Sequence, residues 1–91
     1  MTIKKLSAMP YAQAHIEIDD KGNIYLFSYV TLVASIEDDW LTVYGLYSAT
    51  TRKHISAFVR EYADTNYQVA KQCYNDGYRY NIHTGEIIDI K

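Results

Sequence analysis

The segment from Tyr44 to Phe58 constrains the fold more than any other part of the sequence, because an extended pattern ends in it and a helical pattern begins. Ser48, Thr50 and Thr51 are residue types that cap helices, since their hydroxyls accept hydrogen bonds from free backbone N–H groups. Three basic residues then occupy the expected first turn, where the positive end of the helix dipole disfavours them: Arg52, Lys53 and His54. We therefore expect a helix that starts after Ser48 and either tolerates these charges or uses them.

Two helices are predicted after Ser48. Apolar residues at i, i+3, i+4 and i+7 form one stripe that should pack on a sheet: Ile55, Phe58, Val59 and Tyr62. This helix should end near residues 63–64. Thr65, followed three residues later by Gln68, has the form of a capping box and predicts the start of a second helix. Gly77 supplies the left-handed residue that ends it.

Runs of β-branched and aromatic residues, or alternating apolar and polar residues, predict strands on both sides of the helical region. Residues 24–36 make a run about twice the usual strand length, so a bend or bulge is expected near residues 28–31. The expected strands are residues 14–18, 24–36, 40–47, 78–82 and 86–90.

The predicted elements follow the order β-β-β-α-α-β-β, without the alternation of strand and helix that builds parallel sheets. The expected fold class is therefore α+β, an antiparallel sheet with two helices packed on one face. A chain of 91 residues can enclose one core, so residues 1–91 should form a single domain.

The strand that begins at Ile24 has apolar residues on both of its sides. Tyr25, Phe27 and Tyr29 share one side, whereas Ile24 and Leu26 share the other. Because helices should cover only one face, a further segment or a second subunit must cover the other, and a homodimer is the simplest solution. Large aromatics are typical of protein interfaces, and the candidate partner surface is Tyr25, Phe27, Tyr29 and Trp40. Core packing and stacking of nucleic-acid bases are the other roles open to these side chains.

The polar start of the first helix is a candidate anion site, because free N–H groups, hydroxyls and basic side chains together suit a phosphate or a carboxylate. Its residues are Ser48, Thr50, Thr51, Arg52, Lys53 and His54. The alternative is an ordinary helix cap with basic residues on the surface.

No pattern in the sequence indicates an enzyme, a metal site or a cofactor. The three histidines lack the spacing of metal ligands: His15, His54 and His83. Cys73 lies on the apolar side of the second predicted helix, which predicts a small core residue rather than a nucleophile. Glu61 and Asp64 lie at i and i+3 near a helix end, where no pocket is expected.

Composition narrows the class of partner. The net charge of −2 gives no overall attraction for nucleic acid, so a nucleic-acid partner is less expected than a protein. No apolar run reaches the length that crosses a membrane. The single cysteine, and the lack of an apolar segment after residues 1–6, predict a cytoplasmic protein.

Two segments carry a resemblance. They read Ser28-Tyr29-x-Thr31-x-Val33-Ala34 and Tyr47-Ser48-Ala49-Thr50-Thr51-x-x-His54-Ile55-x-x-Phe58. This pattern resembles small uncharacterised proteins encoded by phages, plasmids and other mobile elements of Gram-positive bacteria. The resemblance implies an accessory factor that binds and modulates host machinery, including inhibitors of CRISPR or other defence systems, and it implies no catalytic residue.

The sequence therefore predicts a non-enzymatic accessory protein that binds and modulates a host protein, with an anti-CRISPR type of inhibitor as one form of that role. Two alternatives stay open. One is a nucleic-acid or nucleotide-binding module that uses residues 48–54, and the other is a structural dimeric module without a ligand.

Overall fold

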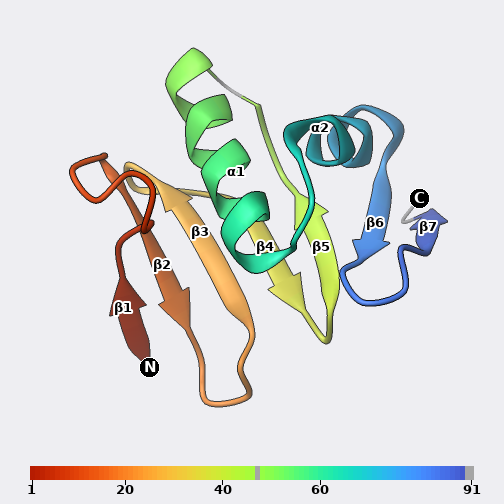
Figure 1. Ribbon diagram of the computed structural model, residues 1–91, viewed down its shortest axis with the longest axis horizontal. Coiled ribbons are helices and arrows are strands. Elements are labelled where there is room, and N and C mark those ends of the chain that lie inside the picture. The colour runs from red at the N-terminus through yellow and green to blue at the C-terminus, as the bar shows by residue number, and fades with distance from the viewer. Residues whose placement is uncertain (47, 90–91) are drawn as a thin grey trace.

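A computed structural model describes residues 1–46 and 48–89 of the protein (Figure 1). The chain forms one antiparallel sheet in which each strand pairs with the next strand in the sequence. The strands are β1 (Thr2–Lys4), β2 (Ala14–Ile18), β3 (Ile24–Ser28), β4 (Thr31–Glu37), β5 (Trp40–Val43), β6 (Tyr78–Asn81) and β7 (Ile87–Asp89). The helices between β5 and β6 are α1 (Ala49–Tyr62) and α2 (Tyr67–Asp76).

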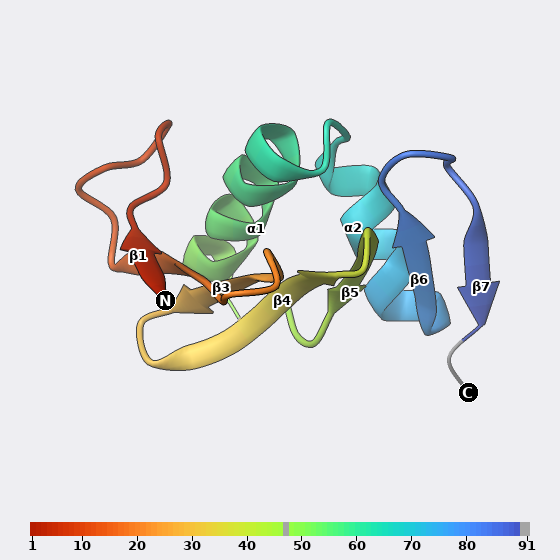
Figure 2. The same ribbon diagram turned by 90° about the horizontal axis from the view of Figure 1, so that it is seen from below.

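Both helices lie on the same side of the sheet, as Figure 2 shows, with α1 over β3 and β4 and α2 over β5 and β6. The predicted class, α+β with an antiparallel sheet and helices on one face, is confirmed. The structure adds two strands to the predicted order. β1 was not expected, and the predicted strand over residues 24–36 is two strands.

That long strand is the main correction to the predicted fold. The chain reverses at residues 29–30, so Ser28 pairs with Thr31 across a two-residue connection. The bend predicted near residues 28–31 is thus a full reversal, and a separate register shift lies between Leu26 and Phe27. The reversal was missed because Tyr29 adopts a φ of 58°, a conformation that usually requires glycine or asparagine.

The core lies between the helices and the sheet. The predicted stripe of α1 is confirmed, since Ile55, Phe58 and Val59 are fully buried and Tyr62 packs against them. Their partners on the sheet are large apolar residues of successive strands, including Ile16, Leu26, Val33 and Leu41, while Leu6 comes from the chain before β2. Cys73 is 3% exposed, so it is a core residue as predicted.

The helix ends follow the sequence with one exception. Ser48 caps α1, because its side chain accepts a hydrogen bond from the backbone N–H of Thr51. Gly77 ends α2 in the left-handed conformation, as predicted. The residue that caps the start of α2 is Asn66 rather than Thr65, and its side chain accepts from the N–H of Val69.

Two predicted strands end differently in the structure. β5 ends at Val43 rather than at residue 47, and residue 47 lies outside the described part of the chain. β7 ends at Asp89, and the predicted last residue of that strand, Ile90, also lies outside the described residues. Within residues 1–46 and 48–89, neither helix combines the length and the apolar character needed to span a bilayer.

Replacement of the cap of α2 tests this assignment. We expect Asn66→Ala to lower the free energy of unfolding by about 1 kcal/mol, because the N–H of Val69 loses its acceptor. Urea unfolding followed by circular dichroism measures the change. Thr65→Ala is the matched control and should stay within about 0.5 kcal/mol of wild type. A larger loss in Thr65→Ala than in Asn66→Ala would contradict the assignment.

Candidate functional site

A cluster of buried hydroxyls and one histidine joins the start of α1 to the end of β3. The Oγ of Ser28 lies 2.9 Å from Nδ1 of His54 and 3.2 Å from Oγ1 of Thr51. Ser48 extends the cluster, because its Oγ donates to Oγ1 of Thr51 at 3.2 Å. Ser28, Thr51 and His54 are each less than 5% exposed. Polar groups buried in this way need one another as partners, so the cluster ties the helix to the sheet.

The residues of the predicted anion site fall into two groups, one that belongs to this buried cluster and one that is exposed. Thr51 and His54 point into the protein, and Ser48 is engaged in capping, whereas Thr50, Arg52 and Lys53 are exposed. Burial lowers the pKa of His54, so at neutral pH this residue is a neutral group rather than the predicted basic one. A hollow of about 310 Å³ opens beside the cluster and is lined by Ser28, Tyr29, Thr31, Val33, Ser48 and Thr51.

Ser28 was not among the predicted site residues. The signal that could have identified it is the resemblance itself, since Ser28 and Thr31 come from the first resembling segment and Ser48, Thr51 and His54 from the second. The structure brings the two segments together at one place.

The outer face of α1 carries three exposed cations: Arg52, Lys53 and Arg60. Within the described residues, none of them forms an ion pair. A shallow hollow of about 210 Å³ lies between Arg52, Lys53, Ser56 and Tyr67. Unpaired cations on one helix face give that face a positive potential.

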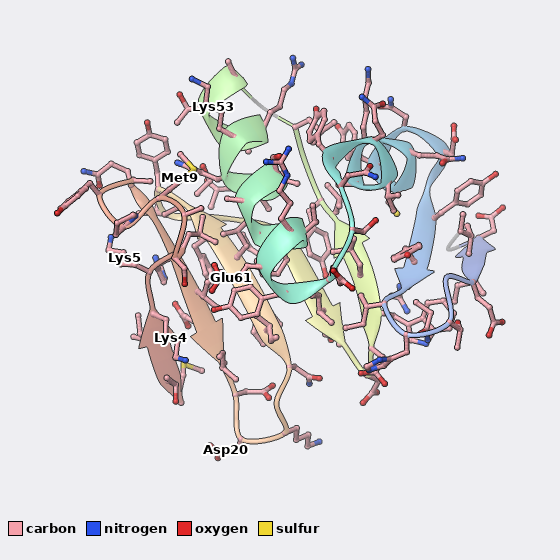
Figure 3. All side chains as sticks on the ribbon, viewed as in Figure 1. Lys4, Lys5, Met9, Asp20, Lys53 and Glu61 are labelled. Carbon is pink, nitrogen blue, oxygen red and sulfur yellow. The ribbon has the colours of Figure 1, made fainter. Side chains whose placement is uncertain are left out.

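A larger groove runs along the other edge of this face. It has a volume of about 490 Å³ and lies between the loop that follows β1 and the outer side of α1. Figure 3 shows Met9 on the loop, with Lys53 and Glu61 on α1. We call it the α1 groove; its lining residues are Ser7, Ala8, Met9, Lys53, Ser56, Ala57, Arg60 and Glu61.

Hydrogen bonds hold the loop against the helix and so preform the groove. Glu61 accepts from Ser7 with both carboxylate oxygens, from the backbone N–H at 2.9 Å and from the hydroxyl at 2.8 Å. Lys5 donates to the carbonyl of Ala12 at 3.4 Å across the base of the loop. The prediction that no pocket lies near Glu61 was wrong, because the loop after β1 folds up beside α1.

The face of the sheet opposite the helices carries most of the predicted partner surface. Cross-strand pairing places Tyr25 and Phe27 on that face beside His15, Glu17 and Ser35. No helix covers this face in the described part of the chain (Figure 2). Trp40 lies at its β4–β5 edge, where it pairs with Glu37.

The aromatics of this face are engaged with their neighbours. The rings of Phe27 and His15 stack with centroids 4.9 Å apart, and the hydroxyl of Tyr25 donates to Asp19 at 3.2 Å. Burial, followed by the charges of Glu37 and Asp19, raises the pKa of Tyr25. Tyr29 was predicted to share this face, but it lies in the β3–β4 turn, where 54% of its surface is exposed.

The three histidines lie in three separate places. His15 contacts Glu17 on the open face, His54 is buried under α1, and His83 contacts Asp39 at 3.1 Å in the turn region. Among residues 1–46 and 48–89, no three His, Cys, Asp or Glu side chains come together as a metal site would require.

We expect the stability of the protein to fall as the pH falls through the range in which His54 titrates. The unfolded chain binds a proton at a pKa of about 6.5, whereas burial holds the folded pKa lower. The contribution of neutral His54 to the free energy of unfolding is therefore fully present above about pH 6.5 and is lost as the pH falls towards the folded pKa. Urea unfolding at several pH values between 8 and 5 measures this slope. His54→Gln is the control, and a slope unchanged in that variant would rule out His54 as its source.

The thiol of Cys73 should be unreactive in the folded protein. Burial raises its pKa to about 11, so almost no thiolate is present at neutral pH, and the side chain is 3% exposed. Reaction with Ellman's reagent at pH 8 should be slow without denaturant and fast in urea. Equal rates in the two conditions would contradict this expectation.

Comparison with curated proteins and with solved structures gives no match. The model of a family of unknown function, DUF8033, matches residues 2–76, which run from the start of β1 to the end of α2. The matched region holds the hydroxyl cluster, the α1 groove and the cationic face of α1, while β6 and β7 follow it. The chain therefore belongs to the DUF8033 family.

Proposed function

We propose that this protein is a non-enzymatic accessory protein that binds another protein through the α1 groove and the cationic face beside it. The observation that carries the proposal is the combination of a preformed groove with unpaired cations at its rim.

The chemistry of the groove is that of a protein interface. Ala8, Met9 and Ala57 line it with apolar atoms, and Lys53 and Arg60 border it with charge. Protein interfaces typically have an apolar centre surrounded by a polar rim, with methionine and arginine enriched. Because Glu61 already fixes the loop, a partner would lose little entropy in ordering this surface.

Nucleic-acid binding is the second candidate function, and the exposure of Arg52 and Lys53 favours it. The other predicted members of that site support it less, since His54 is neutral and buried and Ser48 is engaged as a cap. The net charge of −2 also gives such a complex little long-range attraction.

The uncovered sheet face is the third candidate surface, and it would serve the structural dimer. Tyr25 and Phe27 there are half-buried by neighbours of the same chain. Less of their apolar area is therefore left for a second subunit than the sequence alone predicts.

The identity of the partner rests on the resemblance of the two segments to mobile-element proteins. That resemblance supports a host protein in the cytoplasm as the target, and a defence protein of the CRISPR type is one member of this class. The single, buried cysteine is compatible with a reducing compartment.

Site-specific photocrosslinking separates the three surfaces. Benzoylphenylalanine is placed at position 56 in the groove, at position 27 on the open sheet face or at position 50 at the helix start. After irradiation in host lysate, we expect a nuclease-resistant protein adduct from position 56 that is at least several-fold stronger than the adducts from positions 27 and 50. The reason is that only position 56 lies within the groove.

The charge variants decide whether that adduct depends on the groove. Lys53→Glu/Arg60→Glu should abolish it, whereas Lys4→Glu/Lys71→Glu, with the same change in net charge outside the groove, should not. A dominant adduct from position 27 would favour the sheet face, and a nuclease-sensitive adduct from position 50 would favour nucleic acid. Either result would overturn the proposed function.

A further inference from the structure

We propose that the α1 groove binds a short extended segment of the partner. This segment has one large apolar residue, with an acidic residue two positions before it and another two positions after it. This inference rests on the proposed function and names the chemistry of the ligand.

The shape of the groove favours one inserted apolar side chain. Successive groove-lining residues of α1 lie at i, i+3, i+4, i+7 and i+8, so they form one stripe along the helix: Lys53, Ser56, Ala57, Arg60 and Glu61. Small side chains at positions 56 and 57 leave the middle of the stripe open, and Met9 faces it from the loop. Methionine adapts its shape to a neighbouring apolar group.

The charges lie at both ends of this open middle. Lys53 and Arg60 are seven residues apart, which is about 10 Å along the helix axis. Neither side chain has an ionic partner within the described residues, and the nearby Glu61 is engaged with Ser7. A ligand that brings negative charge to both ends therefore gains two charge contacts without breaking an existing pair.

The backbone spacing of an extended peptide matches this arrangement. Alternate side chains of an extended chain point to the same side, at about 6.6 Å for every two residues. An apolar residue with acidic residues two positions before and after it therefore places three side chains on one face over about 13 Å. The flexible stems of Lys53 and Arg60 cover the difference of about 3 Å.

A second copy of the chain is the main competing protein occupant. The turn between β4 and β5 has the sequence Glu37-Asp38-Asp39-Trp40, with three acids next to a large aromatic. Its acids are adjacent rather than spaced, and Trp40 pairs with Glu37 across the tight turn. This turn is therefore not an extended segment of the inferred pattern.

Fluorescence anisotropy with defined peptides tests the inference. The probe is a fluorescein-labelled peptide with the core Asp-Ser-Leu-Ser-Asp. The comparison peptides replace the leucine by serine or both aspartates by lysine, and a labelled single-stranded oligonucleotide tests nucleic acid. Each probe is titrated with wild-type protein, with Lys53→Glu/Arg60→Glu and with Lys4→Glu/Lys71→Glu, after circular dichroism has shown that the variants are folded.

We expect saturable binding of the Asp-Ser-Leu-Ser-Asp peptide alone. The affinity should fall about tenfold in Lys53→Glu/Arg60→Glu, because two attractive contacts become repulsive, and should stay within about twofold of wild type in Lys4→Glu/Lys71→Glu. Absence of saturable binding overturns the inference, as does equal binding of the serine peptide or tighter binding of the oligonucleotide. Light scattering that shows assembly of wild type but not of Lys53→Glu/Arg60→Glu also overturns it, in favour of a second copy.

Failure of this inference is distinguishable from failure of the proposed function. If position 56 still gives a charge-dependent protein adduct while the peptide does not bind, the groove is a protein-binding site with a ligand of different chemistry. If position 56 gives no adduct and the peptide does not bind, both proposals fail.

Discussion

Burial of a single stripe of α1 against the sheet determines where every functional candidate on the helix layer lies. Ile55, Phe58 and Val59 are fully removed from solvent, and each such side chain contributes on the order of 1.5–3 kcal/mol to folding. Because each residue of a helix is rotated by about 100° from the last, this stripe also fixes the direction of all the others. His54 must then face inward, and Lys53 and Arg60 must face outward beside the loop that carries Met9.

The hydroxyl cluster gives this packing a defined register. Apolar contacts alone tolerate small shifts, whereas a buried hydrogen bond is costly to break because its partners are left without water. Ser28 connects the end of β3 to both Thr51 and His54. The buried polar residues of the two resembling segments, Ser28, Thr51 and His54, therefore have a structural role in this packing.

Local sequence patterns predicted the features that depend on neighbouring residues, such as the stripe of α1, the start of α1 after Ser48 and the left-handed end of α2 at Gly77. The turn at Tyr29 was not predicted, because no residue type that favours turns occurs there. The cap of α2 was assigned to Thr65, because Thr65 and Gln68 have the spacing of a capping box, whereas Asn66 is the cap in the structure. The α1 groove was not predictable from any pattern, since the contact between Ser7 and Glu61 joins residues 54 positions apart. The residues of the candidate anion site do not share one surface, because helical geometry turns Thr51 and His54 inward, away from the exposed side chains of Arg52 and Lys53.

Although the net charge of the chain is only −2, acidic residues gather at the turn end of the sheet and basic residues at the start of α1. Asp20 lies at the turn end of the sheet, far from Lys53 at the start of α1 (Figure 3), and the turns at that end also carry Asp19, Asp38 and Asp39. Lys21 and the N-terminal amine, which lies 3.6 Å from Asp20, offset only part of this negative charge, so a nearby charged body would tend to turn the molecule before the two touch. An anionic partner would be repelled by the turns and attracted by the start of α1. The start of α1 would therefore face the partner in most encounters, which raises the rate of association. Because salt screens these charges, a higher ionic strength would remove this gain in rate.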